Sequence, residues 1–89
     1  MLKLVIVEDE ELDRNGLKRN VNWHDMGIEL VGVYENGYDA FNAIKDSIPD
    51  IILTDIKMPV MDGLILARKV NELSQNVRIV FISGYDDFS

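Results

Sequence analysis

Short, uninterrupted apolar runs separated by longer mixed segments constrain the fold of this chain more than any other feature of its sequence. Three such runs lie at residues 4–7, 51–53 and 79–82, and residues 30–34 form a weaker fourth. Apolar runs of this length without alternation are typical of strands that are buried on both faces of a parallel sheet. The sequence therefore predicts four strands, most of them buried.

The segments between these runs are long enough for helices, and two of the three have apolar residues at helical spacing. In the second segment these residues are Tyr38, Phe41, Ile44 and Ile48, and in the third they are Leu66, Val70 and Leu73. The first segment, residues 10–20, is less clearly periodic. Asn36 and Asp62 stand at N-cap positions, and Pro49 closes the second helix.

The resulting order of elements, β-α-β-α-β-α-β, predicts the fold class. Strands that alternate with amphipathic helices form a parallel sheet with right-handed crossovers and helices on both faces. We therefore expect an α/β fold, a doubly wound parallel sheet in three layers. Its 89 residues are too few for two cores, so the chain is expected to be a single domain.

The composition excludes several classes of function. Nine scattered Lys and Arg against sixteen Asp and Glu give a net charge of −7, which argues against direct binding of nucleic acid. The absence of cysteine excludes disulfides, thiolate metal sites and cysteine nucleophiles, and it fits a reducing cytoplasm. No apolar run approaches the ~20 residues of a membrane span, and the first run is too short for a signal peptide. We therefore expect a cytoplasmic domain without membrane contact.

Candidate chemistry follows the expected strands, because ligands of open parallel sheets bind at the carboxyl ends of the strands. Glu8 and Asp9 follow the first strand, Asp55 follows the third and Ser83 follows the fourth. If the first, third and fourth strands are neighbours, three carboxylates and a hydroxyl converge at one edge. Clustered carboxylates repel one another, so at least one should have a raised pKa unless a cation is bound. Oxygen ligands alone suit Mg²⁺, with Mn²⁺ as an alternative.

A cation at this edge would allow the cluster to accept a phosphoryl group, and a carboxylate can take that group as an acyl phosphate. Asp55 stands out because it follows an apolar run directly and caps no obvious helix. Ser83 either binds the phosphoryl oxygens or is an ordinary turn hydroxyl. A Rossmann or P-loop enzyme is excluded, because the first strand-to-helix turn has no glycine-rich phosphate cradle. Phosphohydrolases with an aspartyl nucleophile have a second Asp two residues later, where Lys57 stands, so this alternative is weaker.

Three blocks of sequence carry a family resemblance: VEDE at residues 7–10, TDIKMPVMDG at residues 54–63 and ISGY at residues 82–85. In this order they resemble the receiver domain of bacterial two-component response regulators. The resemblance extends along the whole chain, and the central block is too distinctive for chance. It implies the flavodoxin-like receiver fold with strand order 2-1-3-4.

The resemblance also implies a function and a role for each candidate residue. Asp55 accepts a phosphoryl group from a sensor histidine kinase, and the domain is not an enzyme beyond its own Mg²⁺-dependent self-phosphorylation and dephosphorylation. Asp9 and Asp55 ligate Mg²⁺, Glu8 assists through water, and the main-chain carbonyl of Lys57 completes the protein ligands. Ser83 is the hydroxyl that moves toward the phosphoryl group on activation.

Further expectations concern what lies outside the chain. Residues 20–38 resemble regulators with an AraC-type DNA-binding output domain, so we expect the switch to control transcription. A receiver domain has a fourth helix, a fifth strand and a fifth helix that this sequence lacks, so residues 1–89 are expected to be one receiver domain, incomplete at its C-terminus. An open edge at residues 78–82 predicts self-association, through that strand or by exchange of the C-terminal segment. Two other hypotheses stay open: a Mg²⁺-dependent phosphohydrolase and a fragment without a competent site.

Overall fold

The computed structural model describes residues 1–58 and 60–82, in which strands alternate with helices. The elements are β1 (Leu2–Val7), α1 (Glu11–Arg19), a short 3-10 helix η1 (His24–Met26), β2 (Ile28–Tyr34), α2 (Gly37–Asp46), β3 (Ile51–Asp55), α3 (Gly63–Leu73) and β4 (Arg78–Ile82). The strands pair in parallel in the order β2-β1-β3-β4. Both the predicted α/β class and the strand order 2-1-3-4 are confirmed.

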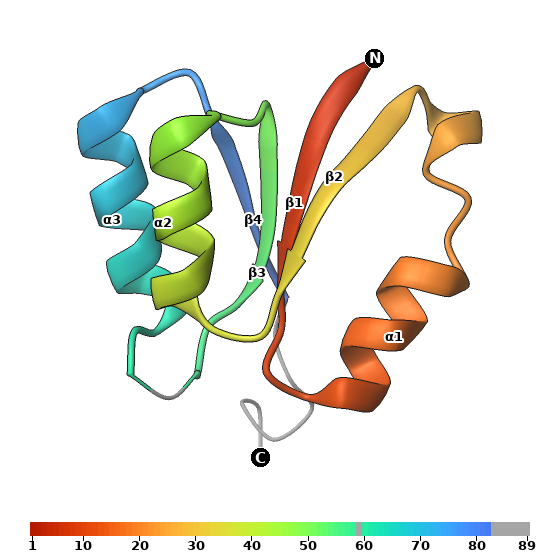
Figure 1. The fold of residues 1–89 in the computed structure, drawn as a ribbon, viewed down its shortest axis with the longest axis horizontal. Coiled ribbons are helices and arrows are strands. Elements are labelled where there is room, and N and C mark those ends of the chain that lie inside the picture. Colours follow the sequence, from red (N-terminus) through yellow and green to blue (C-terminus); the bar gives the residue numbers. More distant parts are fainter. Residues whose placement is uncertain (59, 83–89) are drawn as a thin grey trace.

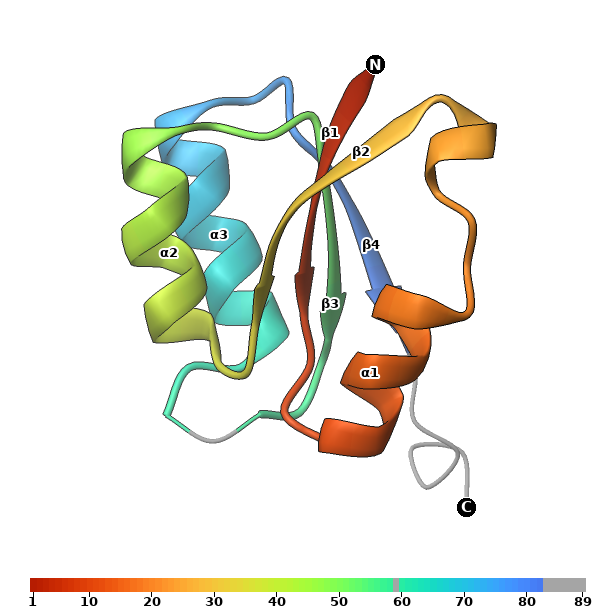
Figure 2. The same ribbon diagram turned by 45° about the vertical axis from the view of Figure 1, so that its right-hand side comes forward.

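The three layers are visible in Figures 1 and 2, where α2 and α3 lie side by side on one face of the sheet and α1 covers the other. The main core lies between the sheet and the α2–α3 layer. Its buried members are Val5, Val7, Ala40, Ile44, Ile52, Met58, Met61, Leu66 and Val70. Strand residues from β1 and β3 thus meet the inner faces of two helices, which is the burial that stabilises this architecture.

The two predicted N-caps are confirmed. Asn36 Oδ1 accepts the main-chain N–H of Asp39 at 2.7 Å, and Asp62 Oδ1 accepts that of Ile65 at 2.8 Å. Each bond satisfies one of the free N–H groups in the first turn of its helix. α2 ends at Asp46, before Pro49.

The predicted buried faces of the helices need correction. Tyr38, Ile48 and Leu73 are exposed, although their spacing placed them on the apolar stripes. α2 instead buries Ala40 and Ile44, and Phe41 is partly buried against the same core. Ile48 lies beyond the end of α2 and therefore cannot follow the helical spacing.

Two strands also differ from the prediction. β2 begins at Ile28 rather than at residue 30, and a bulge at Val31 shifts its register against β1 between Leu4 and Val5. β4 is not buried on both faces, since Val80 is 49% and Phe81 38% exposed. Among the described strands β4 lies at the edge of the sheet, and both faces are partly open there, because consecutive residues such as Val80 and Phe81 point to opposite faces.

α1 is attached to the sheet differently from α2 and α3. None of its residues is buried, and Leu12 is 87% exposed. Near its end, the indole Nε1 of Trp23 donates to the main-chain oxygen of Leu17 at 2.8 Å. Residues 14–17 are half-buried, so α1 buries less of its surface than α2 and α3 do. None of the helices in the described ranges is long and apolar enough to cross a membrane.

Candidate metal centre at the carboxyl edge of the sheet

The carboxyl ends of β1 and β3 lie side by side at one edge of the sheet, the lower edge in Figure 1. Val7 pairs in register with Thr54, so the residues that follow them, Glu8 and Asp55, lie at the same level. One carboxylate oxygen from each of Glu8, Asp9 and Asp55 lies within 4.8 Å of the other two. The structure therefore brings together the three carboxylates that the sequence predicted to converge.

Glu8 is the most enclosed of the three, with 2% of its surface exposed. Its N–H donates to the main-chain oxygen of Tyr34 at 2.9 Å, and its Oε2 accepts the N–H of Glu10 at 3.1 Å. The pKa of Glu8 is raised from 4.5 to about 7, chiefly by burial, with Asp9 and Asp55 acting in the same direction and the bond from Glu10 opposing them. The cluster therefore favours an added positive charge, either a proton or a cation.

Asp55 is held at the start of the loop that joins β3 to α3. Its Oδ1 accepts the main-chain N–H of Ile56 at 2.8 Å. The N–H of Gly63 donates to the main-chain oxygen of Ile56 at 2.7 Å, which folds the loop back onto the end of the strand. A Cβ at Gly63 would overlap the carbonyl oxygen of Asp55, so α3 can begin this close to Asp55 only with glycine at position 63.

The same loop packs against the start of α2. A Cβ at Gly37 would lie 2.7 Å from the main-chain oxygen of Met61, closer than side chains normally approach. Met58 and Met61 are buried, as expected of residues that fill gaps in the core. Val60 between them is exposed and has φ 73°, a conformation that β-branched residues rarely adopt. Such strain persists where the surroundings fix the backbone, so we attribute the shape of this loop to close packing.

Arg14 is a further residue at this edge, and no motif in the sequence points to it. Its Nη1 donates to the main-chain oxygens of Glu8, at 3.0 Å, and Asp9, at 3.3 Å. In the sequence it follows the acidic stretch at residues 8–13, where a basic residue on a helix is normally explained as solvated surface. Only the folded chain shows that this side chain turns back toward the preceding loop.

The other two predicted site residues are not part of the described carboxylate cluster. Ser83 lies outside the described residues, and Lys57 is exposed on the loop two residues after Asp55. Their roles stay predictions. The described centre is a set of carboxylates, and oxygen donors of this kind suit a hard divalent cation.

Comparison of the sequence with models of protein families identifies the family of this chain. Residues 4–89 match the model of the response regulator receiver domain. The chain belongs to this family. The resemblance carried by the three sequence blocks is thereby confirmed, and the chain is a signalling module of two-component response regulators.

Relatives of this receiver domain include regulators of transcription. It is 36% identical over 88 residues to YesN, an uncharacterized transcriptional regulatory protein of Bacillus subtilis, covering 99% of this chain and 24% of YesN. A crystal structure of a two-component transcriptional regulator AraC from Clostridium phytofermentans has a TM-score of 0.87 and 34% identity, covering 98% of this chain and 70% of that one. The chain thus spans about a quarter of the length of YesN.

A more distant solved structure is similar to the receiver domain as well. It is a CheX–CheY–BeF3–Mg²⁺ complex from Borrelia burgdorferi. The similarity has a TM-score of 0.81 and 26% identity, over 92% of this chain and 61% of that chain.

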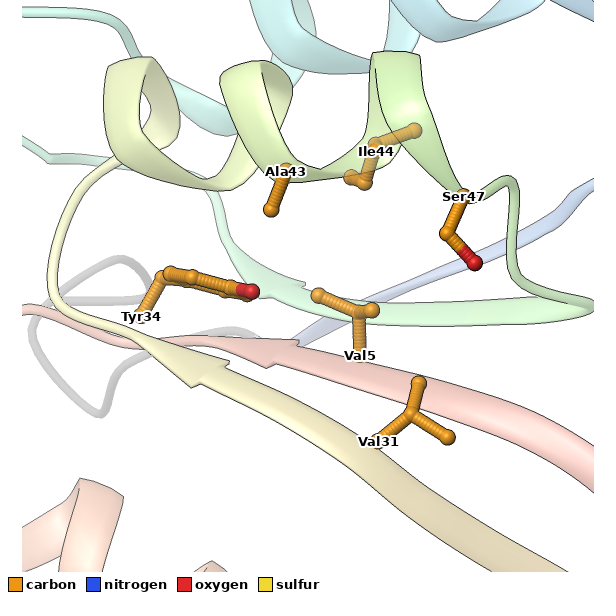
Figure 3. A pocket seen from close by; sticks show the side chains of 6 residues that line it. All are labelled: Val5, Val31, Tyr34, Ala43, Ile44 and Ser47. Carbon is orange, nitrogen blue, oxygen red and sulfur yellow. The ribbon is translucent and has the colours of Figure 1, made fainter.

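A separate cavity of about 80 Å³ lies between β1, β2 and α2. Figure 3 shows the six side chains that line it: Val5, Val31, Tyr34, Ala43, Ile44 and Ser47. They supply aliphatic surface and two hydroxyl groups, and none of them belongs to the carboxylate centre. Pockets for small molecules typically enclose ~300–1,000 Å³, so this cavity does not compete with the carboxyl edge as the functional site.

Proposed function

We infer that this receiver domain is a phosphoacceptor switch in which Asp55 takes a phosphoryl group from the phosphohistidine of a sensor histidine kinase. A carboxylate oxygen of Asp55 forms a bond to phosphorus, the phosphorus–nitrogen bond breaks, and its electron pair returns to the donor imidazole. The observation that carries the proposal is the approach of the carboxylates of Glu8, Asp9 and Asp55 at the ends of adjacent strands. Ile56 N–H donates to Oδ1 of Asp55 at 2.8 Å and so helps to orient the carboxylate.

The donor set fits Mg²⁺, with Mn²⁺ as an alternative. In this proposal Asp9 and Asp55 ligate the cation, Glu8 acts through water, and the carbonyl oxygen of Lys57 completes the protein ligands. The raised pKa of Glu8 supports the fit, because a buried carboxylate that also lies beside Asp9 and Asp55 gains from a neighbouring positive charge. A bound cation supplies positive charge that draws phosphoryl oxygens to a cluster that would otherwise repel them. The related complex with BeF3 and Mg²⁺ supports the same assignment, and Ser83 is proposed to contact the phosphoryl oxygens.

The proposal makes the domain a single-turnover acceptor rather than an enzyme. Its own chemistry is limited to taking up one phosphoryl group and losing it by hydrolysis. A Mg²⁺-dependent phosphohydrolase would instead release phosphate over many turnovers, and a fragment without a competent site would take up none.

We assign residues 1–89 to one receiver domain whose remaining elements belong to a longer, cytoplasmic regulator. Phosphorylation would then switch a DNA-binding output domain of AraC type that lies outside this chain. YesN supports this assignment as a transcriptional regulatory protein of which the chain spans a quarter. The structure from Clostridium phytofermentans supports it as well, since it is named as an AraC two-component transcriptional regulator.

The 89-residue chain on its own is proposed to self-associate. Val80 and Phe81 on β4 are exposed, and β4 has an unpaired edge among the described strands. Exposed apolar strand edges pair with other chains, either edge to edge or by exchange of a segment. Light scattering at several concentrations should show a mass above that of the monomer, and a monomer at high micromolar concentration would contradict this proposal.

The central experiment is phosphorylation of the full-length regulator by acetyl phosphate and Mg²⁺, followed by intact mass. We expect one added phosphoryl group in the wild type and none after Asp55→Asn. Asp46→Asn is a matched control, because Asp46 is an exposed carboxylate in the last turn of α2. Equal labelling of Asp55→Asn would overturn the assignment, and release of many phosphates per chain would favour a phosphohydrolase.

A further inference from the structure

Arg14 lies in the first half of α1 and contacts the loop that carries two of the three carboxylates. Its main-chain N–H donates to the oxygen of Glu10 at 2.8 Å, the hydrogen bond with which the helix begins. Its guanidinium Nη1 turns back to the main-chain oxygens of Glu8 and Asp9, at 3.0 and 3.3 Å. One side chain therefore connects the helix to two consecutive peptide groups of the loop.

Two further hydrogen bonds support the loop: Glu8 N–H donates to the main-chain oxygen of Tyr34 at 2.9 Å, and Glu10 N–H donates to Glu8 Oε2 at 3.1 Å. Glu10, the N-cap residue of α1, makes no side-chain capping bond, and α1 buries none of its residues. The helix is only half-buried at residues 14–17, so it gives the loop less apolar support than a buried helix would. The orientation of a peptide group sets the direction of the neighbouring Cα–Cβ bonds, so a guanidinium that holds two successive carbonyls also sets where the side chains of Glu8 and Asp9 project.

We propose that Arg14 is a positioning residue for the carboxylate centre: it holds Glu8 and Asp9 at the spacing from Asp55 that a divalent cation requires, without binding the cation itself. The inference deepens the proposed function and rests on it. Residues that orient metal ligands typically change affinity by roughly 10–100-fold when they are replaced.

The sign of the effect separates positioning from simple electrostatics. A guanidinium next to the centre is a positive charge, and its removal by itself would strengthen the binding of a cation. Loss of positioning would weaken binding instead. Arg14→Gln therefore gives opposite results under the two explanations.

The test is a Mg²⁺ titration, by calorimetry or by NMR shifts, of the full-length wild type, Arg14→Gln, Arg14→Lys and Arg19→Gln. Arg19 is an exposed arginine in the last turn of the same helix, so its replacement controls for net charge. We expect the Kd for Mg²⁺ to rise roughly tenfold in Arg14→Gln, to rise less in Arg14→Lys, which keeps the charge and a donor, and to be unchanged in Arg19→Gln.

A metal-free readout guards against a variant that fails to fold. Thermal melts without Mg²⁺ establish the folded state, and amide exchange at Glu10, whose N–H bonds Glu8 Oε2, reports the order of the loop. We expect faster exchange at Glu10 in Arg14→Gln, and less so in Arg14→Lys. Equal or tighter Mg²⁺ binding by folded Arg14→Gln would overturn this inference while leaving Asp55 as the acceptor. Absence of Mg²⁺ binding and of phosphorylation in the wild type would instead overturn the proposed function and this inference with it.

Discussion

The two loops that carry the carboxylates are held in place by different kinds of contact. The β3–α3 loop, which follows Asp55, is closely packed, because Gly37 and Gly63 allow main chains to approach each other and Met61 is buried. The β1–α1 loop is held by polar contacts, which include the hydrogen bonds from Arg14 to its carbonyl oxygens and the bond from Glu8 N–H to Tyr34. The position of Asp55 therefore depends on close packing, whereas the positions of Glu8 and Asp9 depend on hydrogen bonding and charge.

The helices that follow the loops differ in the same way. α3 buries Leu66 and Val70 in the main core, whereas α1 buries none of its residues. Asp55, the proposed phosphoacceptor, thus precedes a helix that is anchored in the main core, whereas Glu8 and Asp9 precede a helix with little apolar support. Substitutions that change side-chain volume should therefore affect mainly the β3–α3 loop. Changes of charge or pH should affect mainly the β1–α1 loop.

The largest effect should come from truncating one leucine in each helix layer. Leu66→Ala removes a fully buried side chain from α3 and should lower the free energy of unfolding by about 2–5 kcal/mol. Leu12→Ala in α1 removes a side chain that is 87% exposed and should change it by less than about 0.5 kcal/mol. Urea titration of both variants measures the contrast. Similar losses in the free energy of unfolding would show that the two helix layers contribute equally to stability, which would contradict the comparison.

The second-largest effect should come from adding a methyl group at a glycine. Gly63→Ala places a Cβ against the carbonyl of Asp55 and should destabilise the domain by about 1–3 kcal/mol, displacing the loop and weakening Mg²⁺ binding. Gly16→Ala is the matched control in α1, where the nearest atom, Nδ2 of Asn20, is 3.8 Å away. That variant should be more stable by about 0.5–1 kcal/mol, because alanine favours the helix. A Gly63→Ala variant with normal stability would refute the role given to close packing.

The smallest of these effects concerns charge in the polar loop. The pKa of Glu8 is higher in the folded chain, about 7, than its ordinary value of 4.5. Its contribution to stability is therefore present below about pH 4.5 and is lost as the pH rises through 7. Glu8→Gln cannot ionise, so without divalent cations it should exceed the wild type by about 1–2 kcal/mol near pH 8 and match it near pH 4.5. Urea titrations with a chelator at both pH values check this, and a pH-independent difference would contradict it.

Local chemistry explains which features could be predicted from the sequence. The caps at Asn36 and Asp62 depend on residues three positions apart, and the strand ends at Glu8 and Asp55 follow from uninterrupted apolar runs. The convergence of the carboxylates then follows from a general rule of parallel sheets. These features need no knowledge of side-chain packing.

Features that depend on tertiary packing could not be predicted in the same way. Tyr38 has helical spacing with Ile44, yet only the packing of α2 against its neighbours shows that Tyr38 is exposed. Repulsion predicted one carboxyl with a raised pKa, but burial decides that it is Glu8. The hydrogen bonds of Arg14 and the close approach at Gly63 likewise exist only in the folded chain.

The most direct test of the carboxylate centre is a thermal melt of the wild type with and without millimolar Mg²⁺, near pH 8 and near pH 6. We predict a rise in Tm of about 5 °C at the higher pH, because a ligand of the folded state stabilises it by mass action. The rise should be smaller near pH 6, where protonated Glu8 competes with the cation, and it should vanish in Asp9→Asn. No rise in the wild type, or the same rise in Asp9→Asn, would contradict the account.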